Sequence, residues 1–190
     1  YTLGGGEDTA QALAADRLRA ASKSGGGLAE AARRGAPILA ICASMQLLGR
    51  RYTDAAGRLT EGLGLLDLET SPRGSRAIGE LVESPLLEGL TEQLTGFENH
   101  GGGTCLGPDA APLGEVVRGV GNGCVADTEE VRYEGAVQGS VIATYMHGPV
   151  LARNPQLADL LLARAMGVEL SELEPLEIAV VDKLRLERLK

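Results

Sequence analysis

An uninterrupted apolar run at residues 37–42, with the sequence PILAIC, constrains the fold of this chain more than any other segment. A proline opens the run and a helical pattern follows it. A short apolar stretch of this kind predicts a strand that is buried on both faces, as in a parallel sheet. Residues 137–145 are also apolar and contain β-branched side chains, so they predict a second buried strand.

Helical patterns flank these strands. Asp8 is a good N-cap, and Gln11 stands at the capping-box position three residues later. Asn154 caps a later helix, which has Pro155 at its first position and Gly167 just past its end. The predicted helices span residues 8–21, 28–34, 45–52, 155–166 and 175–190.

The middle of the chain, residues 62–145, predicts short strands separated by Gly, Pro and Asn. Residues 121–123 are predicted as a loop and Glu134-Gly135 as a hairpin turn. Strands and helices alternate at both ends of the chain, which indicates an α/β fold with a mostly parallel sheet flanked by helices. The functional site of such a sheet lies beyond the carboxyl ends of its strands. At 190 residues, the chain fits one domain.

Composition argues against several classes of function. The formal net charge of −8 disfavours nucleic-acid binding as the main role, because an acidic surface repels phosphates. No apolar run approaches the ~18 residues of a membrane-spanning helix. Three cysteines, an odd count in a chain long enough not to need disulfides, favour a reduced compartment such as the cytoplasm. Cys105 and Cys124 lack the C-x-x-C spacing of zinc sites, so no metal site is expected and both are interpreted as structural.

Two predicted strand ends carry residues suited to nucleophilic catalysis. Cys42 lies where the buried strand turns into a helix, a geometry that resembles a nucleophile elbow, and the helix dipole would lower its pKa. His147 follows the second strand, where a neutral imidazole could take a thiol proton. Each residue alone has a plainer explanation, since a free cysteine is usually a small core residue and a histidine in a tight turn can cap backbone groups.

Glycine-rich segments and one arginine are further candidates for binding an anion or a substrate. The three glycines at residues 4–6 suit a phosphate cradle, an oxyanion hole or a plain tight turn. No P-loop motif with its lysine is present, which favours the oxyanion hole over the phosphate cradle and argues against an ATP site in this chain. Arg76 could hold a carboxylate or be a solvated surface residue. Asn99 and His100 lie in a glycine-dense stretch, which is interpreted as a candidate site loop or a structured turn.

The order of these pieces is more specific than any one of them. A glycine-rich turn, a strand ending in cysteine and a strand ending in His-Gly follow one another as in class I glutamine amidotransferase domains. The chain resembles the cobyric-acid-synthase-like branch of that class, and within it the glutaminase subunits of lipid II isoglutaminyl synthases. The matching stretches extend over nearly the whole chain and comprise residues 3–11, 38–49, 61–64, 76–80, 96–102 and 145–155.

The resemblance implies a role for each matching site residue. Cys42 would be the nucleophile that forms a thioester with glutamine, and His147 the general base and acid. This branch lacks the third acidic partner found in many relatives, and residue 149, where that acid would lie, is proline here. Arg76 falls at an arginine needed for glutamine use. Gln46, four residues after the nucleophile, falls at a position that lines the glutamine pocket.

The resemblance also implies an oxyanion hole made of backbone N–H groups, one from Ala43 and one from Gly5 or Gly6. The family usually has Gly-Gly after the nucleophile, whereas this chain has Ala43-Ser44. A positive φ at that point would strain an alanine. Residue 103 is glycine where relatives often carry arginine.

The same resemblance implies a flavodoxin-like fold with a mostly parallel sheet. About fifty residues at the start of that fold, which hold its first strands and helix, are expected to be missing from this chain. It implies no cofactor in this chain. The ammonia would pass to a Mur-ligase-like synthetase subunit (MurT-like), which would bind ATP and Mg²⁺ and amidate the D-glutamate of the lipid II stem peptide. Two alternatives stay open: the amidotransferase part of a corrinoid amidation enzyme, and a non-catalytic protein that stabilises a synthetase.

Overall fold

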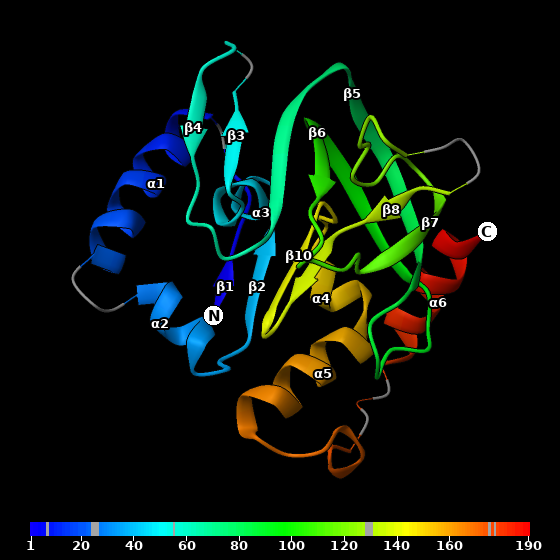
Figure 1. Ribbon diagram of the computed structural model, residues 1–190. Coiled ribbons are helices and arrows are strands. Elements are labelled where there is room, and N and C mark those ends of the chain that lie inside the picture. The colour runs from blue at the N-terminus through cyan, green and yellow to red at the C-terminus, as the bar shows by residue number, and fades with distance from the viewer. Residues whose placement is uncertain (7, 24–26, 55, 128–130, 175, 177) are drawn as a thin grey trace.

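The computed structural model is an α/β fold built on two sheets, and it describes all residues except 7, 24–26, 55, 128–130, 175 and 177 (Figure 1). The first sheet has four strands, in the order β1 (Thr2–Leu3), β2 (Ile38–Ile41), β10 (Val141–Thr144) and β9 (Ala136–Gln138). β1, β2 and β10 run parallel, and β9 joins the edge antiparallel to β10. The carboxyl ends of the three parallel strands therefore meet at one edge of this sheet.

Both faces of the first sheet are buried, as the apolar run at residues 37–42 predicts. Ile38 and Ala40 pack into a core with α2 (Gly27–Arg33) and α3 (Ala43–Leu48), while Leu39 faces a second core with α4 (Val150–Arg153) and α5 (Pro155–Met166). α1 (Asp8–Lys23) begins at the residue expected and contributes Ala15 to a smaller cluster. Figure 1 shows α1 and α2 on one side of the parallel strands and α5 on the other.

The second sheet contains most of the strands predicted for residues 62–145, together with β3 and β4, which lie before that region and were not predicted. Its neighbours pair antiparallel, except that β3 runs parallel to β5. β5 and β6 are 18 and 13 residues long, longer than expected, because their pairing continues past Pro72 and Gly74 through a register shift. The order is β4 (Leu59–Glu61), β3 (Arg51–Thr53), β5 (Leu68–Pro85), β7 (Gly114–Arg118) and β8 (Tyr133–Glu134), with β6 (Leu94–Leu106) paired to β5.

The predicted helix at residues 45–52 is wrong in its second half. α3 ends at Leu48, and Gly49 is extended with φ −68° and ψ −175°. A Cβ atom on Gly49 would lie 2.3 Å from Leu68 Cδ1, so the chain packs closely at this glycine. It then passes directly into β3, which starts at Arg51.

The single strand predicted at residues 137–145 is two strands. β9 and β10 form a hairpin whose turn is Gly139 and Ser140, since Gln138 pairs with Val141. The predicted hairpin turn at Glu134-Gly135 is also wrong. Gly135, with φ 68°, carries the chain from β8 in the second sheet to β9 in the first. The Asn122 side chain fixes this crossing with two 2.9 Å hydrogen bonds to the Gly135 backbone.

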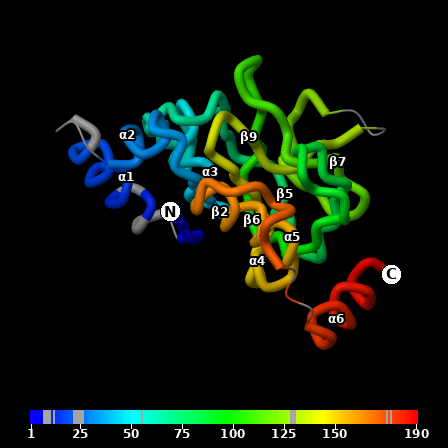
Figure 2. The backbone as a smooth tube through the Cα atoms, turned by 90° about the horizontal axis from the view of Figure 1, so that it is seen from below, coloured from blue at the N-terminus to red at the C-terminus, as the bar shows by residue number. Residues whose placement is uncertain are grey.

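The C-terminal region follows the predicted order of helices. α5 has Pro155 at its first position and Gly167 in the left-handed conformation after its end, as predicted. Asn154 does not cap it, because its side chain bonds Thr95 and the Val150 carbonyl instead. The last helix, α6 (Ala179–Leu189), starts later than predicted, and position 175 is outside the described residues. α6 follows η1 (Leu170–Glu172) and lies at the opposite end of the molecule from α1 (Figure 2).

Two of the three cysteines form a disulfide, which the sequence argument for a reduced compartment did not predict. Cys105 on β6 pairs with Cys124, with a Cα–Cα distance of 4.9 Å. A backbone hydrogen bond from Thr104 to Asn122 brings these two segments together. Cys42 is the free cysteine.

Among the described helices, none combines the length and apolar character needed to cross a membrane.

Candidate active site

Cys42 lies at a sharp turn between β2 and α3. Its φ of 55° makes it the only non-glycine residue with a positive φ in the described part of the chain. Local strain of this kind is typical of a nucleophile elbow. The Cys42 N–H donates to Thr144 O at 2.8 Å, which fixes the turn against β10. The strain anticipated at Ala43 does not occur, because the positive φ falls on Cys42 and Ala43 already begins the helix.

The glycine turn after β1 packs against this elbow. The Ser44 hydroxyl donates to Gly4 O at 2.5 Å, so the residue that replaces the family's glycine ties the two turns together. A Cβ atom on Gly5 would lie 3.0 Å from His147 Cε1 and 3.4 Å from Cys42 Cβ. Gly5, Cys42 and His147 therefore meet at the carboxyl ends of β1, β2 and β10. A Cβ atom on Gly6 would meet nothing within 4 Å, so Gly5 is the glycine that adjoins the pair.

His147 is held by its backbone. It exchanges two hydrogen bonds with Phe97 on β6, of 3.0 and 2.9 Å. Its Nε2 atom is shielded from solvent and has no hydrogen-bond partner among the described residues. No carboxylate in the described ranges forms an ion pair with His147, and Pro149 is exposed nearby. The site is thus a Cys–His pair in the part of the chain that the structure describes.

Burial governs the protonation of this pair. It raises the pKa of the Cys42 thiol above its ordinary value of 9.0, although the Ala43 N–H and the charge of Arg76 act in the opposite direction. The first N–H of the helix therefore acts in the predicted direction, but the predicted net lowering of this pKa is wrong, because desolvation outweighs that contribution. Burial, followed by the charge of His100, lowers the pKa of His147 below its ordinary 6.5. At neutral pH the pair is a thiol beside a neutral imidazole, which is the form in which His147 can accept a proton.

These shifts predict the pH dependence of Cys42 alkylation by iodoacetamide. Because only the thiolate reacts, the labelling rate should rise with a midpoint above the ordinary thiol pKa of 9.0. For a reaction in which Cys42 is the nucleophile, kcat/KM should fall on the acid side with a midpoint below pH 6.5, since His147 must be neutral to act as the base. Mass spectrometry of the Cys42 peptide measures the first profile. A labelling midpoint near neutral pH would instead indicate a thiolate–imidazolium pair.

A cavity of about 310 Å³ opens beside the elbow and holds the predicted substrate-binding residues. Gln46 lines it from α3 and Arg76 from β5. Arg76 is exposed and donates from Nε to Asn99 Oδ1 at 2.7 Å. Asn99 is thereby held against Arg76, although it does not line the cavity itself. His100 does not line the cavity either, because it is buried behind it, with its ring stacked on Tyr145 at a centroid distance of 3.7 Å.

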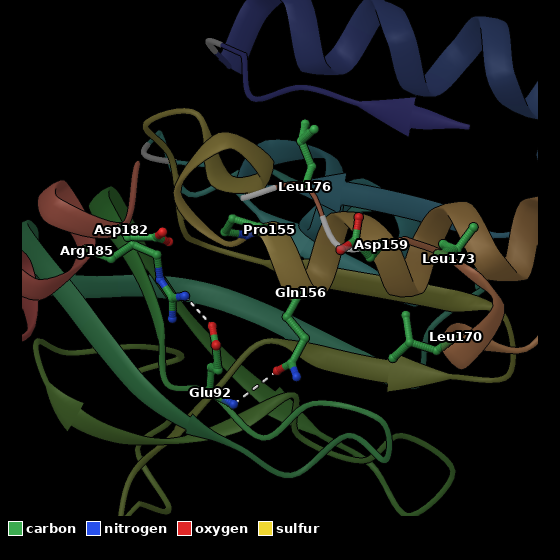
Figure 3. A pocket seen from close by; sticks show the side chains of 9 residues that line it. All are labelled: Glu92, Pro155, Gln156, Asp159, Leu170, Leu173, Leu176, Asp182 and Arg185. Atoms are coloured by element: carbon green, nitrogen blue, oxygen red, sulfur yellow. Dashed lines mark hydrogen bonds and ion pairs between the residues drawn. The ribbon is translucent and has the colours of Figure 1, made fainter. Parts of the chain in front are cut away.

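A second cavity, of about 320 Å³, lies between α5, η1 and α6 (Figure 3). Glu92 forms an ion pair with Arg185 there, and the backbone N–H of Glu92 donates to Gln156 Oε1 at 3.0 Å. Leu170, Leu173 and Leu176 line another part of it. None of the residues predicted for catalysis or substrate binding lines this second cavity. Gln46 and Arg76 line the first cavity, although Cys42 and His147 do not, and Gln46 lies one turn after Cys42 on α3. The first cavity is therefore the candidate substrate cavity beside the Cys–His pair.

A family model described as the CobB/CobQ-like glutamine amidotransferase domain matches residues 1–155. This chain belongs to the CobB/CobQ-like glutamine amidotransferase family. A solved structure described as a glutamine amidotransferase matches with a TM-score of 0.55 and 20% identity, over 87% of this chain and 78% of its own. That match supports the glutamine amidotransferase fold.

Curated relatives narrow the comparison within the CobB/CobQ-like family. The chain is 38% identical to the lipid II isoglutaminyl synthase (glutamine-hydrolyzing) subunit GatD of Staphylococcus aureus, over 94% of this chain and 68% of that protein. It is 39% identical to the subunit of the same name from Streptococcus pneumoniae, over 86% of this chain and 60% of that protein. A probable cobyric acid synthase of Methanothermobacter thermautotrophicus is 38% identical, over 59% of this chain and 23% of its own.

Two residues at this candidate site were missed by the sequence analysis. Gln11, expected in a capping box, instead donates from Nε2 to Ala43 O and to Gln46 Oε1, both at 3.1 Å. Tyr145, expected only as the end of a strand, accepts a 3.1 Å hydrogen bond from Gln46 Nε2. Both lie far from Gln46 along the chain, so no local pattern could have identified them. The only available signal was that each falls inside a stretch matching the family.

Proposed function

We propose that this chain is a glutaminase subunit that hydrolyses L-glutamine and supplies ammonia to a Mur-ligase-like synthetase. That partner would amidate the D-glutamate of the lipid II stem peptide to D-isoglutamine, a step of peptidoglycan biosynthesis. The observation that carries the proposal is the convergence of Cys42, His147 and Gly5 in a chain with two GatD relatives at 38% and 39% identity. The acceptor is inferred from the names of those relatives.

The chemistry follows from the neutral Cys–His pair. His147 takes the proton of the Cys42 thiol as the sulfur attacks the side-chain amide carbon of glutamine. N–H groups of Ala43 and Gly5 are the donors suited to the resulting oxyanion. His147 then returns the proton to the amide nitrogen, the C–N bond breaks and ammonia leaves a γ-glutamyl thioester. A water molecule, deprotonated by His147, cleaves the thioester, and the thiol regains its proton as glutamate departs.

The partner follows from what the sequence lacks. Amide formation from ammonia and a carboxylate requires activation, and this chain has no P-loop motif. ATP and Mg²⁺ are therefore assigned to the synthetase, and no cofactor is assigned to this chain. Lipid II would be reached through the partner, and the pair would work in the cytoplasm as a heterodimer.

Corrinoid amidation is the second candidate function. Cobyric acid synthases from several organisms match this chain, at 34–38% identity, but over only 59–72% of this chain. The GatD matches cover more of the chain at similar identity, which favours the first candidate. A non-catalytic, partner-stabilising role is disfavoured because Cys42 and His147 lie together beside Gly5 and Arg76 lines the neighbouring cavity.

The direct test is glutamine-dependent amidation by the full-length protein mixed with its Mur-ligase-like partner, ATP, Mg²⁺ and lipid II. We expect D-isoglutamine in the stem peptide, and loss of glutamine-dependent but not ammonia-dependent amidation when Cys42→Ala replaces the wild type. Glutamate release without amidation of lipid II, but with amidation of a corrinoid acid by its synthetase, would support the second candidate. Amidation that is unaffected by Cys42→Ala would contradict both.

A further inference from the structure

Three polar side chains form a continuous chain of hydrogen bonds that begins at the wall of the candidate substrate cavity, which Gln11 and Gln46 line, and ends at the buried Tyr145. Gln11 Nε2 donates to Gln46 Oε1 at 3.1 Å, and Gln46 Nε2 donates to Tyr145 OH at 3.1 Å. Gln11 and Tyr145 are 6% and 0% exposed, whereas Gln46 is partly exposed to the cavity. The two buried residues therefore hold the one that a ligand can reach.

The Gln11 end of this chain selects the orientation of the Gln46 amide, and the Tyr145 end is compatible with it. Gln11 Nε2 also donates to Ala43 O, which can only accept, so Gln11 presents N–H groups on this side. Gln46 must then turn its oxygen toward Gln11 and its nitrogen toward Tyr145. The Tyr145 hydroxyl lies 2.6 Å from Thr104 Oγ1, so it can donate there while it accepts from Gln46.

Tyr145 is itself rigidly placed. Its ring stacks on His100 at a centroid distance of 3.7 Å and an interplanar angle of 9°, and its N–H donates to Glu134 Oε1 at 2.6 Å. Burial raises the pKa of Tyr145 to about 12, so the hydroxyl keeps its proton. Gly102 leaves room for the hydrogen bond between Gln46 and Tyr145, because a Cβ atom on residue 102 would lie 2.7 Å from Gln46 Nε2.

We propose that Gln11 and Tyr145 are positioning residues that fix the amide of Gln46 so that it recognises L-glutamine bound for attack by Cys42. The amide keeps one N–H and one oxygen lone pair free for the polar groups of glutamine. This inference rests on the proposed function and names how the same site selects its substrate. Because Gln11 and Tyr145 do not touch the reacting atoms, their loss should weaken binding more than it slows the chemical step.

Tyr145→Phe tests the inference, since it keeps the stacked ring and removes only the hydroxyl. We expect the KM for glutamine to rise about 5–10-fold, the effect of one lost hydrogen bond, with kcat changed less than about twofold. The Kd of glutamine, measured by calorimetry in the Cys42→Ala background, should rise by the same factor. Gln11→Met removes the hydrogen bond to the other end of the Gln46 amide, and it should raise the KM and the Kd for glutamine by a similar factor. Tyr133→Phe, at an exposed side chain on β8, is the matched control and should change neither.

A double-mutant cycle separates positioning from a general structural role. If Tyr145 acts through Gln46, Tyr145→Phe should have no further effect on Kd once Gln46→Ala is present. An unchanged Kd in folded Tyr145→Phe, or an equal increase in both backgrounds, would overturn the inference. Absence of Cys42-dependent glutamate release with glutamine binding intact would instead overturn the proposed function alone, because the Kd values do not depend on turnover.

Discussion

Cys42→Ala is expected to reduce glutamate release from glutamine by about 10⁴-fold or more, because no other group in the site can form the thioester. Cys42 is the free cysteine, and it lies beside His147 and Gly5 at the ends of three parallel strands. The substitution should leave the fold intact, since Cys42 contributes only a small, partly buried side chain. Glutamate release by the purified protein, measured with a coupled dehydrogenase, checks this expectation.

The control for that measurement is Ser44→Ala, two residues along the same turn. It removes the hydrogen bond to Gly4 but no catalytic group, so it should retain most of the activity. Thermal unfolding of both variants separates loss of chemistry from loss of structure. Substantial glutamate release by folded Cys42→Ala would contradict the assignment of the nucleophile.

Gly5→Ala is expected to give the second largest effect, a fall in kcat/KM of about 10–100-fold. The added Cβ would lie 3.0 Å from His147 Cε1 and 3.4 Å from Cys42 Cβ, so the imidazole has to give way by a few tenths of an ångström and its alignment with the thiol changes. Gly5 does not have a positive φ, so alanine fits its backbone and the effect falls on the site. Steady-state kinetics with glutamine measure the loss.

Gly4→Ala is the matched control for Gly5→Ala. A Cβ atom on Gly4 would meet nothing within 4 Å, and its φ is also not positive. The neighbouring substitution should therefore leave kcat/KM nearly unchanged. Equal losses in the two variants would mean that the glycine turn acts through its flexibility and not through its contact with the Cys–His pair.

The positions of Cys42 and His147 could be predicted from the sequence because their signals are local. An apolar run that ends in Cys42 predicts a buried strand and a turn, and the structure has both. His147 follows an apolar segment in the same way. Parallel strands bring their carboxyl ends to one edge, so the two local patterns indicated that these residues lie close together, whereas their catalytic roles were implied only by the family resemblance.

The walls of the site could not be predicted because they depend on contacts between distant segments. Gln46 is separated from Gln11 by 35 residues and from Tyr145 by 99. No periodicity or capping rule reports such pairs, and the capping rule gave Gln11 a different partner. The pKa of Cys42 was mispredicted for a related reason. The direction of the pKa shift is set by how deeply the folded chain buries the Cys42 thiol, and the local sequence that predicts the adjacent helix does not predict that burial.

The strand errors have a common physical cause. Glycines were interpreted as turns, yet Gly135 crosses between sheets and Gly74 lies inside the long β5. The true hairpin at Gly139 and Ser140 was hidden within an apolar segment. Which glycine becomes a hairpin turn is decided by sheet pairing, and that pairing is a tertiary property.

The most direct test of the central claim is to map where a glutamine-mimicking electrophile, such as a chloroketone analogue of glutamine, attaches to the protein. The account predicts one label per chain, on Cys42, with protection by excess glutamine and strongly slowed labelling in His147→Ala. Cys105 and Cys124 are joined in a disulfide and should remain unlabelled. A folded protein that takes no label at Cys42, or takes it without protection by glutamine, would contradict the claim that Cys42 is the nucleophile of a glutamine site.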